Sequence, residues 1–153
     1  MNRSCDVIRL LQGKTLVTAE SLTGGGIGAA LTAVSGSSTV YKGGIISYTD
    51  EIKGNILGVS GDSLKSYGAV STQVAGEMVS GVRKLMRADI AVAVTGLAGP
   101  GCNEYGNPVG TVFIGYEDVK HHVVNRYHFT GDREAIRNRT IETALELILQ
   151  YNL

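Results

Sequence analysis

The chain has 153 residues, enough for one domain with a single well-filled core but not for two. Hydrophobic residues make up 43% and charged residues 18%, a balance that excludes a disordered chain. Its 14 basic and 14 acidic residues cancel, and the densest basic run, Lys120–His122, is too short for a nucleic-acid interface. We expect one globular domain over residues 1–153 that does not bind nucleic acid.

The chain also lacks the signals of export and of metal binding. No run approaches the roughly 18 apolar residues of a membrane span. Asp6 and Arg9 interrupt the apolar pattern near the N-terminus, which argues against a signal peptide. Cys5 and Cys102 are far apart and lack metal-ligand spacing, as expected for free thiols in a reducing compartment. We predict a cytoplasmic protein with no membrane partner, no metal and no cofactor.

Apolar periodicity and turn residues predict the elements in chain order. From the N-terminus we expect a helix over residues 3–12, a strand over 15–19, a helix over 24–34, a strand over 40–48 and two short helices over 50–58 and 62–67. Ser71 should cap a helix over 72–87. The second part should hold a buried strand at 89–95, a long loop at 96–108, a hairpin of strands at 109–116 and 121–129, and a final helix from 131–133 onward. This order predicts an α/β fold, a three-layer α/β/α sandwich around a mixed, mostly parallel sheet.

Ser21 stands where the first strand should turn into a helix, within Ala19–Gly26. The first N–H groups of a helix have no intrahelical partner, and the helix dipole adds positive charge there. Such a place can stabilise an anion or the oxyanion of an acyl-transfer reaction. Alternatively, Ser21 or Thr23 is only a helix cap and the glycines only allow close packing.

Tyr48 and Lys53 form the second candidate group. If Asp50 caps the helix after the 40–48 strand, both residues lie at the same sheet edge as Ser21. Serine needs an adjacent base, and a lysine with a lowered pKa can serve, with tyrosine as a proton relay. The alternative is a half-buried strand tyrosine and a solvated lysine.

Two further segments could bind an anion. The loop Thr95–Gly101 follows a buried strand, and its glycines allow backbone N–H groups to converge, although it matches no phosphate-binding fingerprint. Arg133 and Arg137 lie one helical turn apart and could hold a phosphate or carboxylate, or form surface salt bridges instead. We interpret His121, His122 and His128 as structural or solvent-facing. His122 and His128 share one face of the strand but lie too far apart along it to ligate one metal without a bend.

Six segments in the same order closely resemble the CinA C-terminal domain family, over about residues 3–150. They are Thr18–Gly25 (TAESLTGG), Ile46–Lys53 (ISYTDEIK), Gly68–Ser71 (GAVS), Thr95–Pro100 (TGLAGP), Pro108–Val112 (PVGTV) and Gly131–Arg133 (GDR). The resemblance implies a nicotinamide-nucleotide amidase that converts nicotinamide mononucleotide to nicotinate mononucleotide and ammonia. It also implies the stand-alone form of this domain, with the nucleophile at Ser21 and its partners at Tyr48 and Lys53.

Resemblance and residue chemistry together predict a mechanism. Lys53, with Tyr48 as relay, deprotonates Ser21, and N–H groups of Leu22, Thr23, Gly24 and Gly25 hold the oxyanion. The nucleotide phosphate binds either the loop that contains Thr95, Gly96 and Gly99 or the side chains of Arg133 and Arg137.

Three positions depart from the family pattern. Asp50 stands where asparagine is usual, Cys102 where glycine is commoner and Asn107 where lysine is commoner. A carboxylate at position 50 favours charged Lys53, which opposes a role as base. One alternative is therefore a non-catalytic pyridine-nucleotide-binding or regulatory module; another is a serine hydrolase that pairs Ser21 with His128. We also expect a symmetric homo-oligomer, most simply a dimer.

Overall fold

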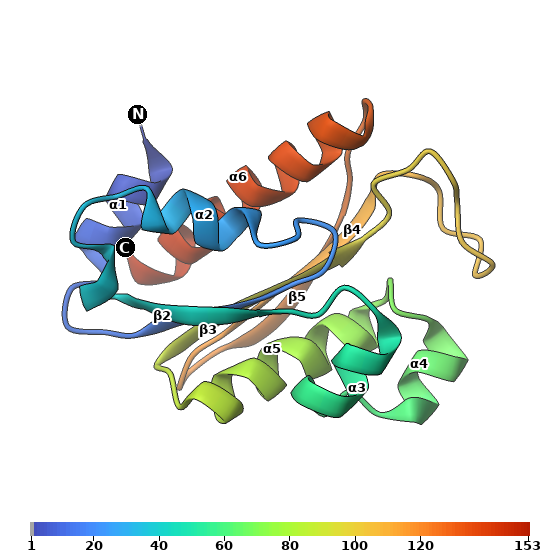
Figure 1. Cartoon of the computed structure of the whole chain (residues 1–153), viewed down its shortest axis with the longest axis horizontal. Coiled ribbons are helices and arrows are strands. Elements are labelled where there is room, and N and C mark those ends of the chain that lie inside the picture. Colours follow the sequence, from blue (N-terminus) through green and yellow to red (C-terminus); the bar gives the residue numbers. More distant parts are fainter. Residues whose placement is uncertain (1) are drawn as a thin grey trace.

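The computed structural model describes residues 2–153 as one sheet between two layers of helices (Figure 1). In chain order the elements are α1 (Arg3–Leu10), β1 (Leu16–Glu20), α2 (Gly26–Thr32), the short 3-10 helix η1 (Ser37–Thr39), β2 (Tyr41–Ile46), α3 (Asp50–Leu57), α4 (Gly61–Tyr67), α5 (Thr72–Met86), β3 (Ile90–Gly96), β4 (Thr111–Glu117), β5 (His122–His128) and α6 (Arg133–Asn152). No helix within these residues has both the length and the apolarity to cross a membrane.

The sheet has five strands in the order β2-β1-β3-β4-β5. β1 pairs in parallel with β2 and β3, whereas β4 is antiparallel to both β3 and β5. Only β4 therefore runs against the other strands, which confirms the predicted mixed sheet. The chain leaves β1 toward β2 and then crosses back to β3 on the other side of β1, so a crevice opens at the carboxyl ends of β1 and β3.

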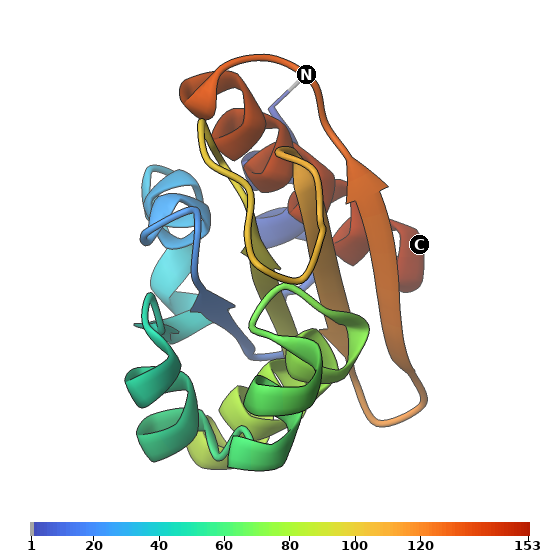
Figure 2. The same ribbon diagram turned by 90° about the vertical axis from the view of Figure 1, so that its right-hand side faces the viewer.

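Each face of the sheet has its own hydrophobic core. Figure 2 shows α1, α2 and α6 on one side and α3, α4 and α5 on the other. Along β3, Ile90, Val92 and Val94 enter the first core, while Ala91 and Ala93 enter the second against α5. Both faces of β3 are thus buried, which explains its uninterrupted apolar sequence and confirms that prediction.

The helix caps were predicted with mixed success. Ser71 caps α5, as expected, because its Oγ accepts the Val74 N–H at 3.2 Å. The prediction that Asp50 caps α3 was wrong: Thr49 is the cap, with extended backbone at φ −111° and a hydroxyl that accepts the Ile52 N–H. Asp50 lies in the first turn instead, where the helix dipole favours a carboxylate.

Gly81 sets the distance between α3 and α5. A β-carbon at position 81 would overlap the Leu57 carbonyl oxygen at the end of α3. The glycine therefore lets α3 lie directly against α5, and this contact fixes the height of α3 above the sheet.

Candidate active site

A pocket of about 290 Å³ opens at the carboxyl ends of β1, β2 and β3. It draws residues from the first turn after each of these strands and from the loop after β3. Its lining consists of Ser21, Leu22, Tyr48, Asp50, Lys53, Ala69, Val70, Thr95, Gly96, Leu97, Ala98, Gly99, Gly101 and Arg133. This is the place where open α/β sheets build their sites.

Ser21 and Lys53 meet inside this pocket. The Lys53 Nζ donates to the Ser21 Oγ at 3.0 Å and to the Ser47 carbonyl oxygen at 2.7 Å. Lys53 is only 1% exposed, although it lies on a short helix at the surface. The Ser47 N–H in turn donates to the Glu20 carbonyl oxygen at 2.8 Å, which ties the lysine's acceptor to the residue before the serine.

The surroundings of Lys53 make loss of its proton easier than for a lysine in water. Burial lowers the pKa of the Lys53 ammonium, and the Asp50 carboxylate opposes this shift but is the weaker influence. Within residues 2–153 no salt bridge reaches the Lys53 ammonium. A buried amine with only neutral oxygens as direct partners is a suitable base for the hydroxyl that it contacts.

Tyr48 lies at the mouth of the pocket rather than between the other two side chains. It is 55% exposed, and its hydroxyl accepts a hydrogen bond from Arg133 at 2.9 Å. In residues 2–153 no hydrogen bond joins Tyr48 to Ser21 or Lys53, so the expected relay geometry is not formed here. Arg133 also donates to the Gly99 carbonyl oxygen at 2.8 Å and so links the tyrosine to the loop after β3.

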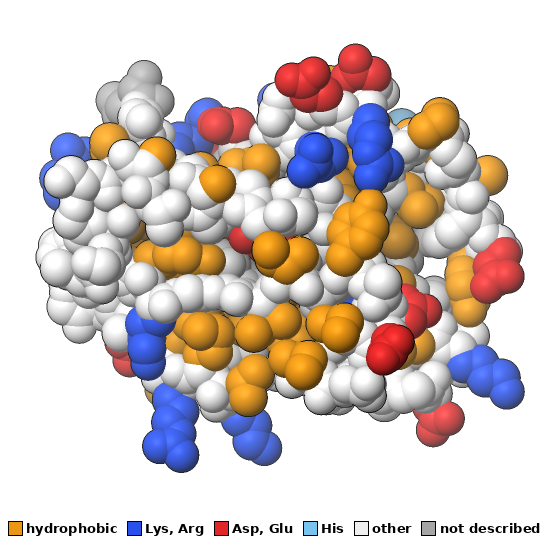
Figure 3. Space-filling model, in the orientation of Figure 1, with side chains coloured by type: hydrophobic (Ala, Val, Ile, Leu, Met, Phe, Trp, Pro, Cys, Tyr) orange, Lys and Arg blue, Asp and Glu red, His pale blue; other side chains and the backbone are white. Residues whose placement is uncertain are grey.

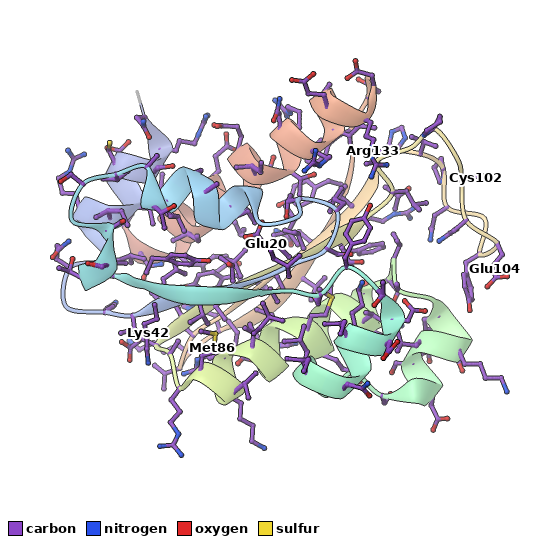
Figure 4. The ribbon with its side chains drawn as sticks, in the orientation of Figure 1. Glu20, Lys42, Met86, Cys102, Glu104 and Arg133 are labelled. Atoms are coloured by element: carbon purple, nitrogen blue, oxygen red, sulfur yellow. The ribbon has the colours of Figure 1, made fainter. Side chains whose placement is uncertain are left out.

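Glu20 occupies the helix end that was expected to hold an anion. Its carboxylate is 2% exposed and accepts from the Ile27 N–H at 2.8 Å and the Gly28 N–H at 3.0 Å. It also accepts from the Thr23 hydroxyl at 2.7 Å. Figure 4 shows Glu20 between α2 and the sheet. The Ile27 and Gly28 N–H groups at the start of α2 are therefore already used by Glu20, so the anion at this helix end is a side chain of the protein itself.

The turn between Glu20 and α2 still offers backbone donors. The Gly24 N–H donates to the Ser21 carbonyl oxygen. The N–H groups of Leu22, Thr23 and Gly25 have no acceptor among the described residues. Gly24 and Gly25 adopt positive φ values of 58° and 101°, so α2 begins at Gly26 rather than at the predicted residue 24.

Arg137 supports this turn from outside the pocket. Its guanidinium donates to the Leu22 carbonyl at 2.9 Å and to the Thr23 carbonyl at 3.2 Å. The two arginines of α6 therefore have separate partners, Arg133 in the pocket lining and Arg137 behind the turn, and they do not converge on one point.

The loop after β3 supplies one wall. Thr95, Gly96 and Gly99 all line the pocket, but the Thr95 hydroxyl is turned away to the Ala69 carbonyl at 2.9 Å. Asn107 donates to the Val70 carbonyl at 3.1 Å and so holds the far part of the loop against the start of α5. His128 lies on β5, outside the pocket lining, and its ring contacts the Val109 carbonyl.

Two functional residues were missed in the sequence analysis. Glu20 was quoted only as part of the motif, although a carboxylate at the end of an otherwise apolar strand needs compensating donors. The first N–H groups of the helix that begins a few residues later can supply such donors. The contact between Glu20 and this helix could therefore have been inferred from the sequence. The Ser47 carbonyl carries no sequence signal, because any residue supplies one.

Fold and pocket together define an α/β domain with a serine–lysine pair at the switch point of its sheet. The family model of the CinA C-terminal domain matches residues 4–152, so the chain belongs to the CinA family. It is 49% identical over 147 residues to a CinA-like protein of Thermotoga neapolitana, a match that covers 95% of this chain and 36% of that relative. The chain thus spans little more than a third of the length of the curated relatives that it matches.

Solved structures of the family have the same fold. Competence damage-inducible protein A from Klebsiella pneumoniae is 37% identical with a TM-score of 0.94, over 97% of this chain and 93% of that chain. The competence/damage inducible protein CihA from Agrobacterium tumefaciens is 38% identical with a TM-score of 0.92, over 99% and 94% of the respective chains.

Proposed function

We propose that this domain is an amidase that hydrolyses the carboxamide of nicotinamide mononucleotide to nicotinate mononucleotide and ammonia. The observation that carries the proposal is the 3.0 Å contact between the buried Lys53 Nζ and the Ser21 Oγ at the pocket floor. The resemblance of the six motifs to characterised amidases of the CinA C-terminal domain family supports the substrate.

The reaction proceeds in two halves. Neutral Lys53 takes the proton of Ser21 as the Oγ attacks the carboxamide carbon, and the carbonyl oxygen becomes an oxyanion. Free N–H groups of Leu22 and Thr23 lie beside the serine and stabilise that charge. The Lys53 ammonium returns the proton to the leaving nitrogen, ammonia departs, and water, deprotonated by Lys53, then hydrolyses the acyl ester and regenerates Ser21.

The lining suits a flat cationic ring with an anionic tail. Leu22, Val70 and Leu97 supply apolar contacts for the ring. The Asp50 carboxylate complements the positive charge of the pyridinium, and Arg133, at the mouth beside Tyr48, complements the phosphate. The Tyr48 hydroxyl accepts from Arg133, so its own proton is available to the substrate.

The test is ammonia release from nicotinamide mononucleotide by the purified chain and its Ser21→Ala variant. We expect turnover by the parent, none by Ser21→Ala, and unchanged turnover by Ser66→Ala, which removes an exposed serine of α4. Near-normal ammonia release by Ser21→Ala, with its fold verified by circular dichroism, would disprove the proposed nucleophile.

A second candidate is a binding or regulatory module of the same fold, and Asp50 is the observation that favours it. Its carboxylate raises the pKa of Lys53 and so holds back the base. This alternative predicts that the parent protein binds nicotinamide mononucleotide in calorimetry while it releases no ammonia.

A further inference from the structure

The turn of residues 21–25, between β1 and α2, carries the nucleophile and the oxyanion donors of the proposed function. Glu20, the residue before this turn, has a carboxylate that is 2% exposed and accepts hydrogen bonds on both oxygens. The donors are the Thr23 hydroxyl, the N–H groups of Ile27 and Gly28, and the Thr18 hydroxyl. The carboxylate therefore connects the residue before the turn with residues inside and beyond it, and it closes the turn from the interior of the protein.

Two glycines make room for this carboxylate and its neighbours. A β-carbon at Gly28 would lie 2.7 Å from the Tyr41 hydroxyl and 3.5 Å from the Glu20 carboxylate. A β-carbon at Gly44 would overlap the Thr18 hydroxyl, which itself lies 2.7 Å from the hydroxyl of Tyr41. The network is therefore closely packed, and this packing restricts the Glu20 carboxylate and the turn that it closes to one arrangement.

Arg137 holds the same turn from the direction of α6. Its guanidinium donates to the carbonyl oxygens of Leu22 at 2.9 Å and Thr23 at 3.2 Å. In a trans peptide the carbonyl and the following N–H point in opposite directions, so the bond to the Leu22 carbonyl turns the Thr23 N–H away from Arg137. The Gly24 N–H holds the Ser21 carbonyl in the same way, at 3.0 Å, and so fixes the direction of the Leu22 N–H. Figure 3 shows basic side chains where α6 begins, on the face on which Figure 1 shows this turn.

We propose that Glu20 and Arg137 are positioning residues of the amidase reaction. Both hold the turn of residues 21–25 so that its backbone donors meet the oxyanion of the tetrahedral intermediate. The inference rests on the proposed function, because it concerns the geometry of the same reaction. In the structure of residues 2–153 neither side chain lines the pocket, so each acts through the backbone of the turn rather than on the substrate. Such donors must be in place before the charge forms, and a misplacement of about 1 Å costs about 10²-fold in rate.

This role differs from that of a phosphate ligand, which the sequence left open for Arg137. A phosphate ligand binds the substrate and the transition state alike, so its loss raises KM and leaves kcat nearly unchanged. A residue that positions the oxyanion donors acts only in the transition state, so its loss lowers kcat and leaves KM nearly unchanged. Arg133, which does line the pocket, remains the proposed partner of the phosphate.

The first experiment compares kcat and KM for nicotinamide mononucleotide in the parent and in Glu20→Gln. Glutamine presents one oxygen and one NH2 group, so its NH2 group faces donors that the carboxylate had accepted. We expect kcat to fall about 10- to 100-fold, with KM within about twofold of the parent. A folded Glu20→Gln variant as fast as the parent overturns the inference.

Asp89→Asn is the matched control for Glu20→Gln. Asp89 accepts the Thr15 N–H at 2.8 Å, at the opposite end of β1. Loss of this carboxylate should lower stability but leave kcat unchanged, because the turn of residues 21–25 is not affected. Circular dichroism and thermal unfolding verify that each variant is folded under assay conditions.

Arg137→Met is the second variant, and it decides the matter where Glu20→Gln is too unstable to assay. It removes a half-buried guanidinium and leaves the buried carboxylate in place. We expect kcat to fall about tenfold with KM nearly unchanged. Arg139→Met is its control, since the Arg139 guanidinium lies over the Phe129 ring at 5.4 Å instead of at the turn. A raised KM with an unchanged kcat would make Arg137 a phosphate ligand and overturn its positioning role.

The pH profile separates this role from an effect on the base. Both variants should lower the plateau of kcat but leave the ascending limb at the pH of the parent, because the Lys53 hydrogen bonds to Ser21 and to the Ser47 carbonyl are retained. A limb that moves in either variant overturns the inference. A parent that releases no ammonia overturns the proposed function and this inference with it, whereas an active parent with equally active variants overturns this inference alone.

Discussion

Each end of the sheet holds a polar cluster, buried around Lys53 and half-buried around Asp118, but the clusters use their hydrogen bonds differently. At the end opposite the pocket, the Asp118 carboxylate accepts the Tyr116 hydroxyl at 2.6 Å, the His121 ring at 3.0 Å and the Lys120 N–H at 2.8 Å. Burial raises the pKa of the Asp118 carboxyl, but these hydrogen bonds outweigh it and lower that pKa to about 2.

Lys53 at the pocket end is buried without such compensation. It contacts two neutral oxygens, and the one carboxylate that acts on it, Asp50, does not cancel the effect of burial on its pKa. A saturated cluster stabilises the fold and is chemically inert, whereas an under-compensated amine is reactive. The two ends therefore differ in how fully hydrogen bonds compensate for burial, and the incompletely compensated end is the one where we propose the active site.

The largest expected effect comes from removal of the reactive amine. Lys53→Met retains a buried chain of similar length but no base, so amidase turnover should fall by at least about 10³-fold with the fold intact. Lys53→Arg should be equally inactive, because guanidinium stays protonated. Ammonia release measures turnover, and thermal unfolding shows whether the fold is intact. Substantial turnover by Lys53→Met would contradict the role of Lys53 as base.

The lowered pKa of Lys53 predicts a pH dependence. Below that pKa, kcat/KM should rise about tenfold per pH unit, because only the neutral amine accepts the proton. The unfolded chain holds this proton up to about pH 10.4, so folding stability should also rise with pH between the folded and unfolded pKa values of Lys53. Lys53→Met should remove that part of the stability increase; an identical stability profile in both proteins would argue against the pKa shift.

Asp118→Asn tests the saturated cluster. The lowered pKa of Asp118 corresponds to stability that is present above its unfolded pKa near 3.9 and is lost as pH falls through about 2. After allowance for solvent screening, we expect the variant to lose about 1 kcal/mol at neutral pH, with the difference shrinking below pH 4. Denaturant unfolding measures it, and amidase activity should stay unchanged; a loss of activity would mean that the two ends are coupled.

The smallest effect is expected from Asp50→Asn. Because the Asp50 carboxylate raises the pKa of Lys53, its removal should move the ascending limb of the activity profile to lower pH and raise kcat about threefold on that limb. KM for the cationic substrate should rise as the pyridinium loses its counter-charge. An unmoved limb would show that Asp50 has no influence on the base.

Local patterns predicted the architecture well, because each signal has a local cause. The uninterrupted apolar sequence predicted β3 as a strand buried on both faces, and Ser71 predicted the start of α5. Neither prediction needed information on tertiary contacts. The site depends on contacts between elements that are distant in sequence. Arg133 reaches Tyr48 and Arg137 reaches Leu22 only after α6 packs over the sheet, and no spacing within the sequence encodes those distances. The Ser21–Lys53 proximity followed from the strand-end rule and the family resemblance rather than from composition.

Gly81 affects the position of Lys53 in the pocket through the contact between α5 and α3. Because α3 rests on α5 through this glycine, a single added methyl group at position 81 would push the whole helix outward and Lys53 with it. Water would then reach the amine and return its pKa toward that of a free lysine. The pKa of Lys53 therefore depends on a contact with α5, a helix that contributes no residue to the pocket lining.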